Sequence, residues 1–452
     1  MEKENNNTKQ ARRSALYKSI WRWHFYAGLI VMPFLFILAL TGGIYLYKPQ
    51  IQEALYHEYY HVEAQGEAMA PSAQIALVKE EYPGAMINRY RPQDSEDRSA
   101  EVGMMNAGEA TTVFVDPYNG TILGSMRDDR MIMNQLEVIH GELSAGTLGD
   151  RIVELAACWA IILIFTGLYM WWPRKKGIWG TWLPRLSKGK KLAARDLHVV
   201  PAVWISAGMF FLIMTGLPWS GLWGNIVQVV ATNSGEGYPP SIWVGDAPTS
   251  NMTTGELGDV SWNAEELPVP ESTPQEAVPV SIDNVVATAQ QRDVFPAYDV
   301  LIPTSPEGVY TISTFPPRAQ DEATVHIDQY SGAVLADYRF DDYGIAGKTI
   351  ALGITLHRGT QFGLINQLIG SLICLGILGI VLSGFWLWKK RKPEGNLGAP
   401  KAPPISKLRW VWLLILFFGV FFPLVGLSII IVALIDFLIV KRVPRLKAFL
   451  NA

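Results

Sequence analysis

The sequence predicts a polytopic α-helical membrane protein that carries two α+β domains on one side of the bilayer. Three observations indicate this fold class. Hydrophobic residues make up 49% of the 452 residues, they gather in long uncharged runs, and the second half of the chain repeats the first. A helix needs about 20 apolar residues to cross a hydrocarbon core about 30 Å thick, and each run is near or above that length. We therefore expect two parallel repeats of helix, outer domain and helix, followed by a C-terminal hydrophobic helix or hairpin.

The apolar runs divide the chain into spans, loops and outer domains. The first run is too long for a cleaved signal peptide and follows polar and basic residues, so we expect it to stay as an anchor. The predicted parts in chain order are a cytoplasmic N-terminus (1–23), a span (24–47), an outer domain (48–150), a span (151–172), a cytoplasmic loop (173–197), a span (198–221), an outer domain (222–350), an outer segment with the fourth span (351–388), a cytoplasmic loop (389–409), a last apolar run (410–440) and a basic tail (441–452).

The distribution of charge orients these parts. The formal net charge is only −3, but basic residues concentrate in the short segments, which the positive-inside rule places in the cytoplasm. The two long segments that alternate with them are therefore expected outside, and both are rich in Asp and Glu. The last apolar run is too long for one untilted span and too short for two. Pro423 near its middle and the basic flanks indicate a kinked helix or a hairpin that returns to the cytoplasm.

Each outer segment shows the same local pattern. A helical pattern at Ser72 to Glu81, and again at Ser281 to Gln290, precedes short alternating stretches that are typical of strands. The clearest of these stretches are Met86–Arg91, Thr111–Val115 and Val309–Thr314. We expect a helix on a small antiparallel sheet in each domain. Residues 233–278 are dense in Gly, Pro and polar residues, which indicates an ordered excursion or a flexible loop.

The internal repeat identifies the features that the architecture uses twice. Five positions or motifs align between the halves. They are His24 with His198, Thr41-Gly42 with Thr215-Gly216, Val113–Gly120 with Val325–Gly332, His140 with His357, and Thr166-Gly167 with Ser383-Gly384. The small residues among them leave room for a flat cofactor or serve plain helix packing.

The four repeating histidines are the candidate cofactor-binding residues. Histidine is costly in lipid, and neutral imidazole is the usual axial ligand of b-type haem. His24 and His198 begin spans at the cytoplasmic end, whereas His140 and His357 precede spans on the outer side. A ligand pair within one repeat would have to bridge most of the membrane. We therefore predict two haem b groups, an inner one bound by His24 and His198 and an outer one bound by His140 and His357. A histidine that is merely hydrogen-bonded at the interface explains this recurrence less well.

The other histidines and the cysteines carry weaker signals. His57 and His61 lie one helical turn apart, which would suit a metal, but no third ligand is evident and a solvated surface is favoured. His326 falls on a predicted strand and is interpreted as a sheet residue. Cys158 and Cys374 both lie in spans, and no CxxC or CxxCH motif occurs. This pattern excludes thiol redox chemistry, iron–sulfur clusters and covalent c-type haem.

Several of these segments also carry a resemblance to a known family. The chain resembles the PepSY-associated transmembrane family, whose members include bacterial inner-membrane ferric-siderophore reductases and iron-uptake proteins. The resemblance covers most of the chain and rests on His24–Gly28, Thr41-Gly42, Val113–Gly120, Val325–Gly332, His140, Thr166–Pro173 and Phe422–Ser428. It implies PepSY-like periplasmic domains in the bacterial inner membrane, and a di-haem protein that passes electrons outward to a periplasmic ferric complex. The matching ligand positions are His24, His140, His198 and His357. The long acidic stretch before the second outer domain departs from the family pattern.

The chemistry of iron release agrees with such an electron carrier. Ferric siderophores hold Fe(III) through hard oxygen ligands that Fe(II) fits less well, so one electron weakens the complex. No side chain then has to act as a catalytic acid, base or nucleophile. The cytoplasmic loops are too short for a flavin or nicotinamide domain, and no dinucleotide fingerprint occurs. We therefore expect a quinol or a cytoplasmic reductase as electron donor, and no nucleic-acid partner.

Two other functions compete with this interpretation. The outer domains could bind or inhibit a periplasmic protease, or sense a ligand, while the spans merely anchor them; the recurring histidines would then be unexplained. Alternatively, the protein could transport iron or the siderophore. The spans contain almost no acidic residues apart from Glu154 and Asp436, which is unfavourable for moving cations.

Overall fold

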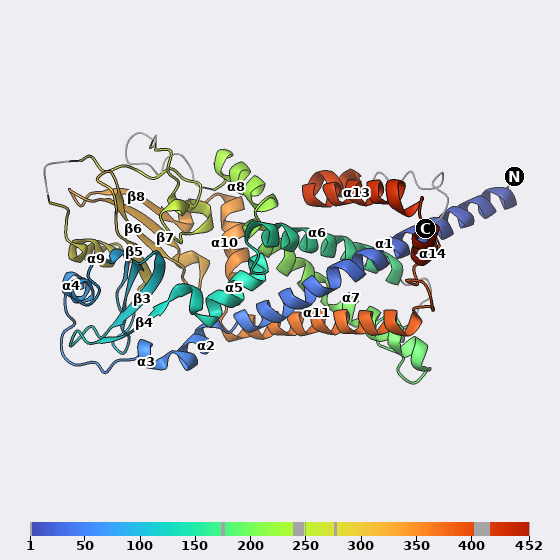
Figure 1. Ribbon diagram of the computed structural model, residues 1–452, viewed down its shortest axis with the longest axis horizontal. Coiled ribbons are helices and arrows are strands. Elements are labelled where there is room, and N and C mark those ends of the chain that lie inside the picture. The colour runs from blue at the N-terminus through green and yellow to red at the C-terminus, as the bar shows by residue number, and fades with distance from the viewer. Residues whose placement is uncertain are drawn as a thin grey trace. The chain divides into compact units, whose positions relative to one another are not determined.

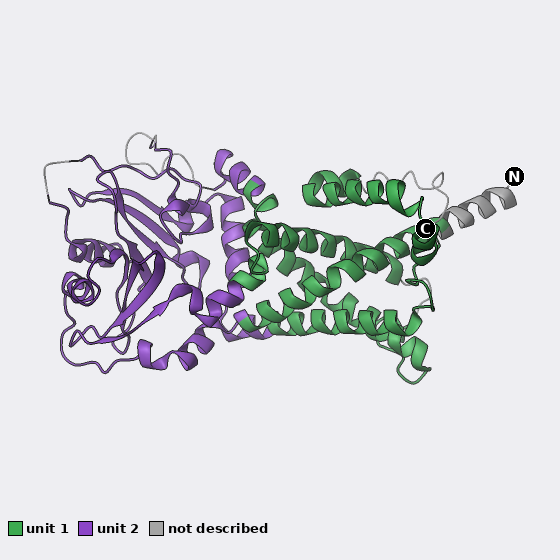
Figure 2. Ribbon diagram, viewed as in Figure 1, with its two compact units in different colours: residues 1–44, 138–225, 369–452 green, residues 45–137, 226–368 purple. Residues whose placement is uncertain are grey.

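The computed structural model describes residues 2–172, 177–237, 248, 250–274, 278–401 and 416–451, with the backbone alone described for 2–14. Parts of the predicted segments 173–197, 222–350, 389–409 and 410–440 therefore lie outside the described residues. The chain forms two compact units (Figure 2). Unit 1 comprises residues 1–44, 138–225 and 369–452, and unit 2 comprises residues 45–137 and 226–368. Each unit thus takes segments from both sequence repeats.

The long apolar helices belong mainly to unit 1 (Figure 1). Among the described residues, five helices are long and apolar enough to cross a membrane. They are α1 (Glu2–Tyr45, a candidate span from Ala15), α6 (Gly146–Trp171), α7 (Lys190–Gly216) with the 3-10 turn Leu217–Trp219, α11 (Leu364–Arg391), and α13 (Pro423–Ile435) with the π-helical turn Asp436–Val440. Ile30, Trp204 and Leu372 on these helices are 65%, 63% and 67% exposed, as expected where lipid is the solvent. The helical part of the predicted fold class is confirmed, and the chain is a multi-pass membrane protein.

One buried cluster joins four of these helices. Ala39 on α1, Ala160 on α6, Met209 on α7 and Ile377 on α11 pack together in it. Lipid tails are as apolar as these side chains, so helices in a membrane associate through close packing rather than through the hydrophobic effect. The small alanine side chains allow that close approach. The bundle can therefore hold polar groups between its helices in fixed positions.

The described part of the last apolar run folds back on itself. Residues 416–421 are helical, and the chain then passes through Phe422, whose extended backbone ends that helix before Pro423 begins α13. A Cβ atom on Gly426 would lie only 2.5 Å from the carbonyl oxygen of Gly419. In a continuous helix, residues seven apart are about 10 Å apart along the axis. Of the two alternatives left by the sequence, the geometry of the described residues favours the hairpin.

The C-terminal tail packs beside the start of the first span. The tail ends in α14 (Pro444–Leu450). Arg22 on α1 donates to the carbonyls of Pro400 and Asn451 over 2.7 and 2.9 Å, and the Tyr26 hydroxyl donates to the Leu450 carbonyl. Segments from three predicted cytoplasmic parts of the chain therefore meet within unit 1.

Unit 2 is built on one antiparallel sheet of eight strands in the order β4-β3-β2-β1-β5-β6-β7-β8. The strands are β1 (Met86–Arg91), β2 (Ala100–Asn106), β3 (Glu109–Val115), β4 (Ile122–Arg127), β5 (Tyr298–Leu301), β6 (Val309–Thr314), β7 (Ala323–Asp328) and β8 (Val334–Arg339). The predicted strands are confirmed. The expectation of two separate small sheets is corrected, because β1 and β5 pair and so remove the open edge that each half would otherwise present.

The join between β1 and β5 relates the two repeats by a local twofold axis. One of its residue pairs is Tyr90 with Val300. Through their neighbouring strands, Tyr90 is in register with Val113 and Val300 with Val325. Val113 and Val325 align in the sequence repeat, so Tyr90 pairs with its own structural equivalent. The axis of unit 2 therefore passes through this pair.

A charged cluster lies beside this join. Arg91 donates two hydrogen bonds to Asp299, from Nε to Oδ1 over 2.9 Å and from Nη2 to Oδ2 over 2.6 Å. Arg89 adds a third contact to the same carboxylate at 3.4 Å. Burial alone would raise the pKa of Asp299, but the charges of Arg91 and Arg89 outweigh burial and hold that pKa below its usual range. The β1–β5 join thus combines a short strand pairing with a bidentate, charge-assisted hydrogen-bonded pair between Arg91 and Asp299.

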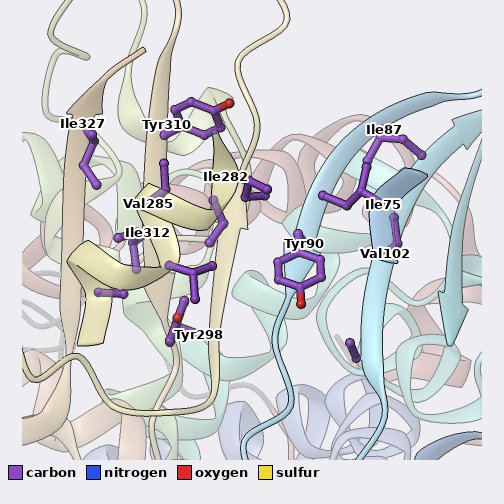
Figure 3. Packing of buried hydrophobic residues seen from close by; sticks show 14 of the residues in the cluster. Ile75, Ile87, Tyr90, Val102, Ile282, Val285, Tyr298, Tyr310, Ile312 and Ile327 are labelled. Carbon is purple, nitrogen blue, oxygen red and sulfur yellow. The ribbon is translucent and has the colours of Figure 1, made fainter. Parts of the chain in front are cut away.

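Two helices pack on one face of the sheet and form the main core of unit 2. They are α4 (Pro71–Glu81) and α9 (Ile282–Gln291), which confirm the two predicted helical patterns. Figure 3 shows Ile75 of α4 beside Ile87 and Val102, and Val285 of α9 among strand residues of the second repeat. Asp283 accepts hydrogen bonds from the backbone and hydroxyl of Ser72. Both repeats therefore share one hydrophobic core.

The opposite face is covered by shorter elements. In the second repeat, residues 250–274 pack on it with buried Trp262 and Leu267, so this part of the predicted excursion is ordered. In the first repeat, Tyr59 and Tyr60 contact Phe114 with ring centroids 5.3 Å apart. The remaining described elements are α2 (Lys48–Leu55), α3 (His57–Tyr60), α5 (Ile132–Glu142), α8 (Trp223–Asn233), α10 (Ile345–His357), and the 3-10 turns Asp128–Arg130, Thr254–Glu256, Trp262–Ala264, Ala319–Asp321 and Phe340–Asp342.

Candidate functional site

His24 lies on α1 and is held by α6. Its Nδ1 atom is 2.9 Å from the hydroxyl oxygen of Thr166. That hydroxyl donates its own proton to the Ile162 carbonyl four residues earlier, over 2.7 Å. With the hydroxyl proton in that bond, Thr166 accepts from the ring, and we assign the proton of His24 to Nδ1.

His198 lies on α7 and is held in the same way by α11. Its Nδ1 atom is 3.1 Å from the Ile380 carbonyl oxygen and 3.4 Å from the Ser383 hydroxyl. A carbonyl accepts but never donates, so His198 must also carry its proton on Nδ1. The two sites match across the repeat, because Thr166 aligns with Ser383.

His140 lies on α5 and contacts α1. Its Nδ1 atom is 2.9 Å from the Thr41 hydroxyl, which donates to the Ile37 carbonyl over 2.8 Å. The proton assignment is therefore the same as for His24. Thus α1 carries both the His24 ring and the acceptor for another histidine.

A tight corner between α5 and α6 brings His140 into this position. Leu143 and Ser144 adopt left-handed backbone conformations with φ of 50° and 55°, which are unfavourable for residues other than glycine. A Cβ atom on Gly149 would lie 1.6 Å from the carbonyl oxygen of Glu142, so only glycine allows the two helices to meet this closely. The fold-back that His140 needs to contact the bundle is therefore present.

Each of these three histidines lies against a glycine. A Cβ atom at Gly167 would be 3.3 Å from Cε1 of His24, and one at Gly384 would be 3.1 Å from Cε1 of His198. The corresponding distance from Gly42 to His140 is 2.9 Å. An added methyl group would push each ring away from its hydroxyl or carbonyl partner. The Thr-Gly and Ser-Gly dipeptides thus provide one acceptor and one open space for the adjacent ring.

His24 and His198 form the best-defined pair. Both belong to unit 1 and both are half-buried. In the described part of the chain, no hydrogen bond reaches Nε2 of either ring. A neutral imidazole that donates from Nδ1 keeps the Nε2 lone pair for a metal. The donor set therefore fits two axial haem ligands.

The predicted outer pair divides between the units. His140 belongs to unit 1, whereas His357 is the last residue of α10 in unit 2. Their association stays a prediction from the repeat. The sequence identified Thr41, Thr166 and Ser383 as repeat anchors but did not assign them to histidines. The recurrence of a hydroxyl residue before each glycine was the available signal.

Other polar groups in the spans and the sheet have structural roles. Glu154 on α6 accepts from the backbone N–H groups of Leu222 and Trp223 over 2.9 and 3.2 Å, so it caps the turn that leads into α8. His326 on β7 is fully buried against Thr311, with Nδ1 to Oγ1 at 2.9 Å. Burial lowers the pKa of His326 to about 3. The interpretation of His326 as a sheet residue is confirmed.

Comparison with known proteins supports the resemblance seen in the sequence. A family model described as the PepSY-associated TM region matches residues 21–391, which is most of the chain. No curated protein matches the chain.

Proposed function

The chain belongs to the PepSY-associated TM region family, and we propose that it is a haem b electron-transfer protein that reduces a ferric siderophore, or another Fe(III) complex, outside a bacterial inner membrane. The observation that carries this proposal is the way His24 and His198 are held. Equivalent positions of the two repeats each present an imidazole with Nδ1 engaged and Nε2 available. Histidines that served only helix packing would not be expected to leave Nε2 without a partner at both equivalent positions.

The surrounding residues prepare both rings for a flat cofactor. Thr166 and the Ile380 carbonyl fix the tautomers, and Gly167 and Gly384 set how closely the rings approach α6 and α11. Such outer partners orient a ligand and raise its basicity. When bound at His24 and His198, a haem b would supply one-electron redox chemistry.

We propose the same role for His140 and His357 at an outer haem b. The support is the sequence repeat together with the contact of His140 with Thr41, which has the same form as the contact of His24 with Thr166. A quinol or a cytoplasmic reductase would then act as donor, and the periplasmic Fe(III) complex would be the substrate. Reduction weakens the complex because Fe(II) fits hard oxygen ligands less well.

The hydrogen bonds of Glu154, one of the two acidic residues named in the spans, do not favour cation transport. Glu154 uses both carboxylate oxygens to accept backbone hydrogen bonds from Leu222 and Trp223. A carboxylate that is engaged in this way is not available to a passing ion. This observation favours electron transfer over movement of iron through the bundle.

The optical spectrum of the purified protein tests the proposal. We expect a reducible b-type spectrum with two haems per chain after expression in haem-replete cells. Ser206→Ala is a suitable control, because among the described residues the Ser206 hydroxyl bonds only to the Val203 carbonyl of its own helix, and the variant should retain both haems. A colourless folded protein would instead support the alternative function, in which the outer unit binds or inhibits a periplasmic partner or senses a ligand without redox activity.

A further inference from the structure

A second cluster of metal-ligating side chains lies in unit 2, apart from the haem histidines. Glu53 on α2, His57 on α3 and His61 just after α3 bring one ligand atom each to within 4.8 Å of one another. The sequence showed the two histidines one helical turn apart but no third ligand. The structure supplies Glu53 as that third ligand, from the preceding helix.

The two imidazoles are arranged side by side. Their rings stack with centroids 4.2 Å apart and planes inclined by 27°. Nε2 of His61 contacts Oε1 of Glu53, and Nδ1 of the same ring faces Asp97 at 3.7 Å. The negative charge of Asp97 behind one ring nitrogen favours a cation at the opposite nitrogen.

Glu53 can bind an ion through Oε1 while it keeps its hydrogen bond with Arg98. Arg98 donates to Oε2 of Glu53 over 2.6 Å, whereas His61 contacts the other oxygen, Oε1. Glu53 is therefore an anionic ligand whose second oxygen is already positioned.

The backbone around the cluster is fixed by the sheet. Ser99 donates from its backbone to the Tyr60 carbonyl over 2.9 Å and from its hydroxyl to the Tyr59 carbonyl over 2.7 Å. Tyr59 and Tyr60 also pack on the buried Phe114. Because α3 is held in this way, His57 and His61 keep their relative position, and ion binding would require little ordering of the chain.

We propose that Glu53, His57 and His61 bind one divalent first-row transition-metal ion. Two imidazoles and one carboxylate are the donor set of many Zn(II) sites and of Fe(II) sites with open positions. Hard ions such as Mg(II) prefer oxygen ligands and are disfavoured here. The site shares no residue with the histidines assigned to haem, so it stands independently of the proposed redox function.

Calorimetric titration of the tag-free, full-length protein in detergent with Zn(II) tests the proposal. We expect one saturable site for Zn(II) at pH 7.5. His57→Ala and Glu53→Gln should each weaken binding at least about tenfold, as loss of a ligand requires. The matched control is Glu58→Gln, because Glu58 lies on the same short helix outside the cluster, and it should bind as the wild type does.

Circular dichroism spectra and size-exclusion profiles of the variants show whether a loss reflects misfolding. Unchanged spectra and profiles together with lost Zn(II) binding would support the site. The proposal would be overturned if the wild type bound no Zn(II), if Mg(II) bound equally well, or if the double substitution His57→Ala, His61→Ala left the Zn(II) isotherm unchanged.

Discussion

The two repeats hold their equivalent histidines with the same kinds of partner but in exchanged order. His24 makes its 2.9 Å contact with a hydroxyl, and His198 makes its 3.1 Å contact with a carbonyl, while the Ser383 hydroxyl lies farther away at 3.4 Å. Both arrangements place the proton on Nδ1. The comparison indicates that both repeats keep a hydrogen-bond acceptor at Nδ1, although the acceptor group differs. Two histidine ligands to one metal would each require such an acceptor.

Removing either ring should have the largest effect. His24→Ala and His198→Ala should each reduce the haem content from two per chain to one, because a single remaining imidazole leaves one axial position open. A pyridine haemochrome assay on the purified variants measures this. If one substitution abolished haem and the other left both groups bound, the two repeats would not share a site and the comparison would fail.

The repeats meet differently in unit 2, where Arg91 and Asp299 face each other across the β1–β5 join. Asp299→Asn removes the charge that Arg91 and Arg89 require, so we expect a loss of about 2 kcal/mol in unfolding free energy, less than for a fully buried pair because Arg91 is partly exposed. Denaturant unfolding of the full-length protein measures it. Asp129→Asn is the control, because the Asp129 side chain is 65% exposed whereas that of Asp299 is 15% exposed. Equal effects of the two substitutions would show that the join is not specially stabilised.

Loss of the hydroxyl partner of His24 should weaken haem binding more than loss of the hydroxyl partner of His198. Thr166→Val keeps the shape of the side chain but removes the closest acceptor of His24, and we expect about tenfold weaker haem retention. Ser383→Ala should cost less than about threefold, because the Ile380 carbonyl still accepts from His198. Haem transfer to apomyoglobin gives both values. Equal losses would mean that the exchanged order of partners has no energetic consequence.

The smallest expected effect is a pH dependence of the unfolding free energy that arises from residues of the second repeat. Burial raises the pKa values of Glu265 and Glu322 to about 7. The folded protein then holds protons that the unfolded chain has lost, so stability falls as pH rises toward 7 and is lowest above it. Each of the two glutamates should lower the unfolding free energy by less than about 1 kcal/mol between pH 6.5 and 8. Below pH 6.5 the buried His326 opposes this trend, because its pKa is lowered.

Thermal unfolding at pH 6.5 and pH 8, followed by tryptophan fluorescence, measures this dependence. The double substitution Glu265→Gln, Glu322→Gln should flatten it. A profile that the double substitution does not change would place the pH dependence elsewhere in the chain.

The sequence predicted the elements well and their association less well. Hydrophobic runs and periodicity identified the five long apolar helices, α4, α9 and strands such as β1, because lipid and a half-buried sheet impose regular patterns. The pairing of β1 with β5 left no local signal, since it depends on two residue pairs far apart in the chain. Glu53 was missed for a similar reason: its position beside His61 depends on the turn between two short helices. The contact of His24 with Thr166 also required coordinates, although both residues had been singled out by the repeat.

The pairing of Tyr90 with its own equivalent, Val300, has an evolutionary consequence. Two identical chains that met through this strand would form an isologous contact, with each copy completing the sheet of the other. A single-repeat ancestor could therefore have worked as a homodimer before gene duplication fused the copies. Expressed alone, the first half of the present chain should either dimerise through β1 or aggregate along its uncovered edge.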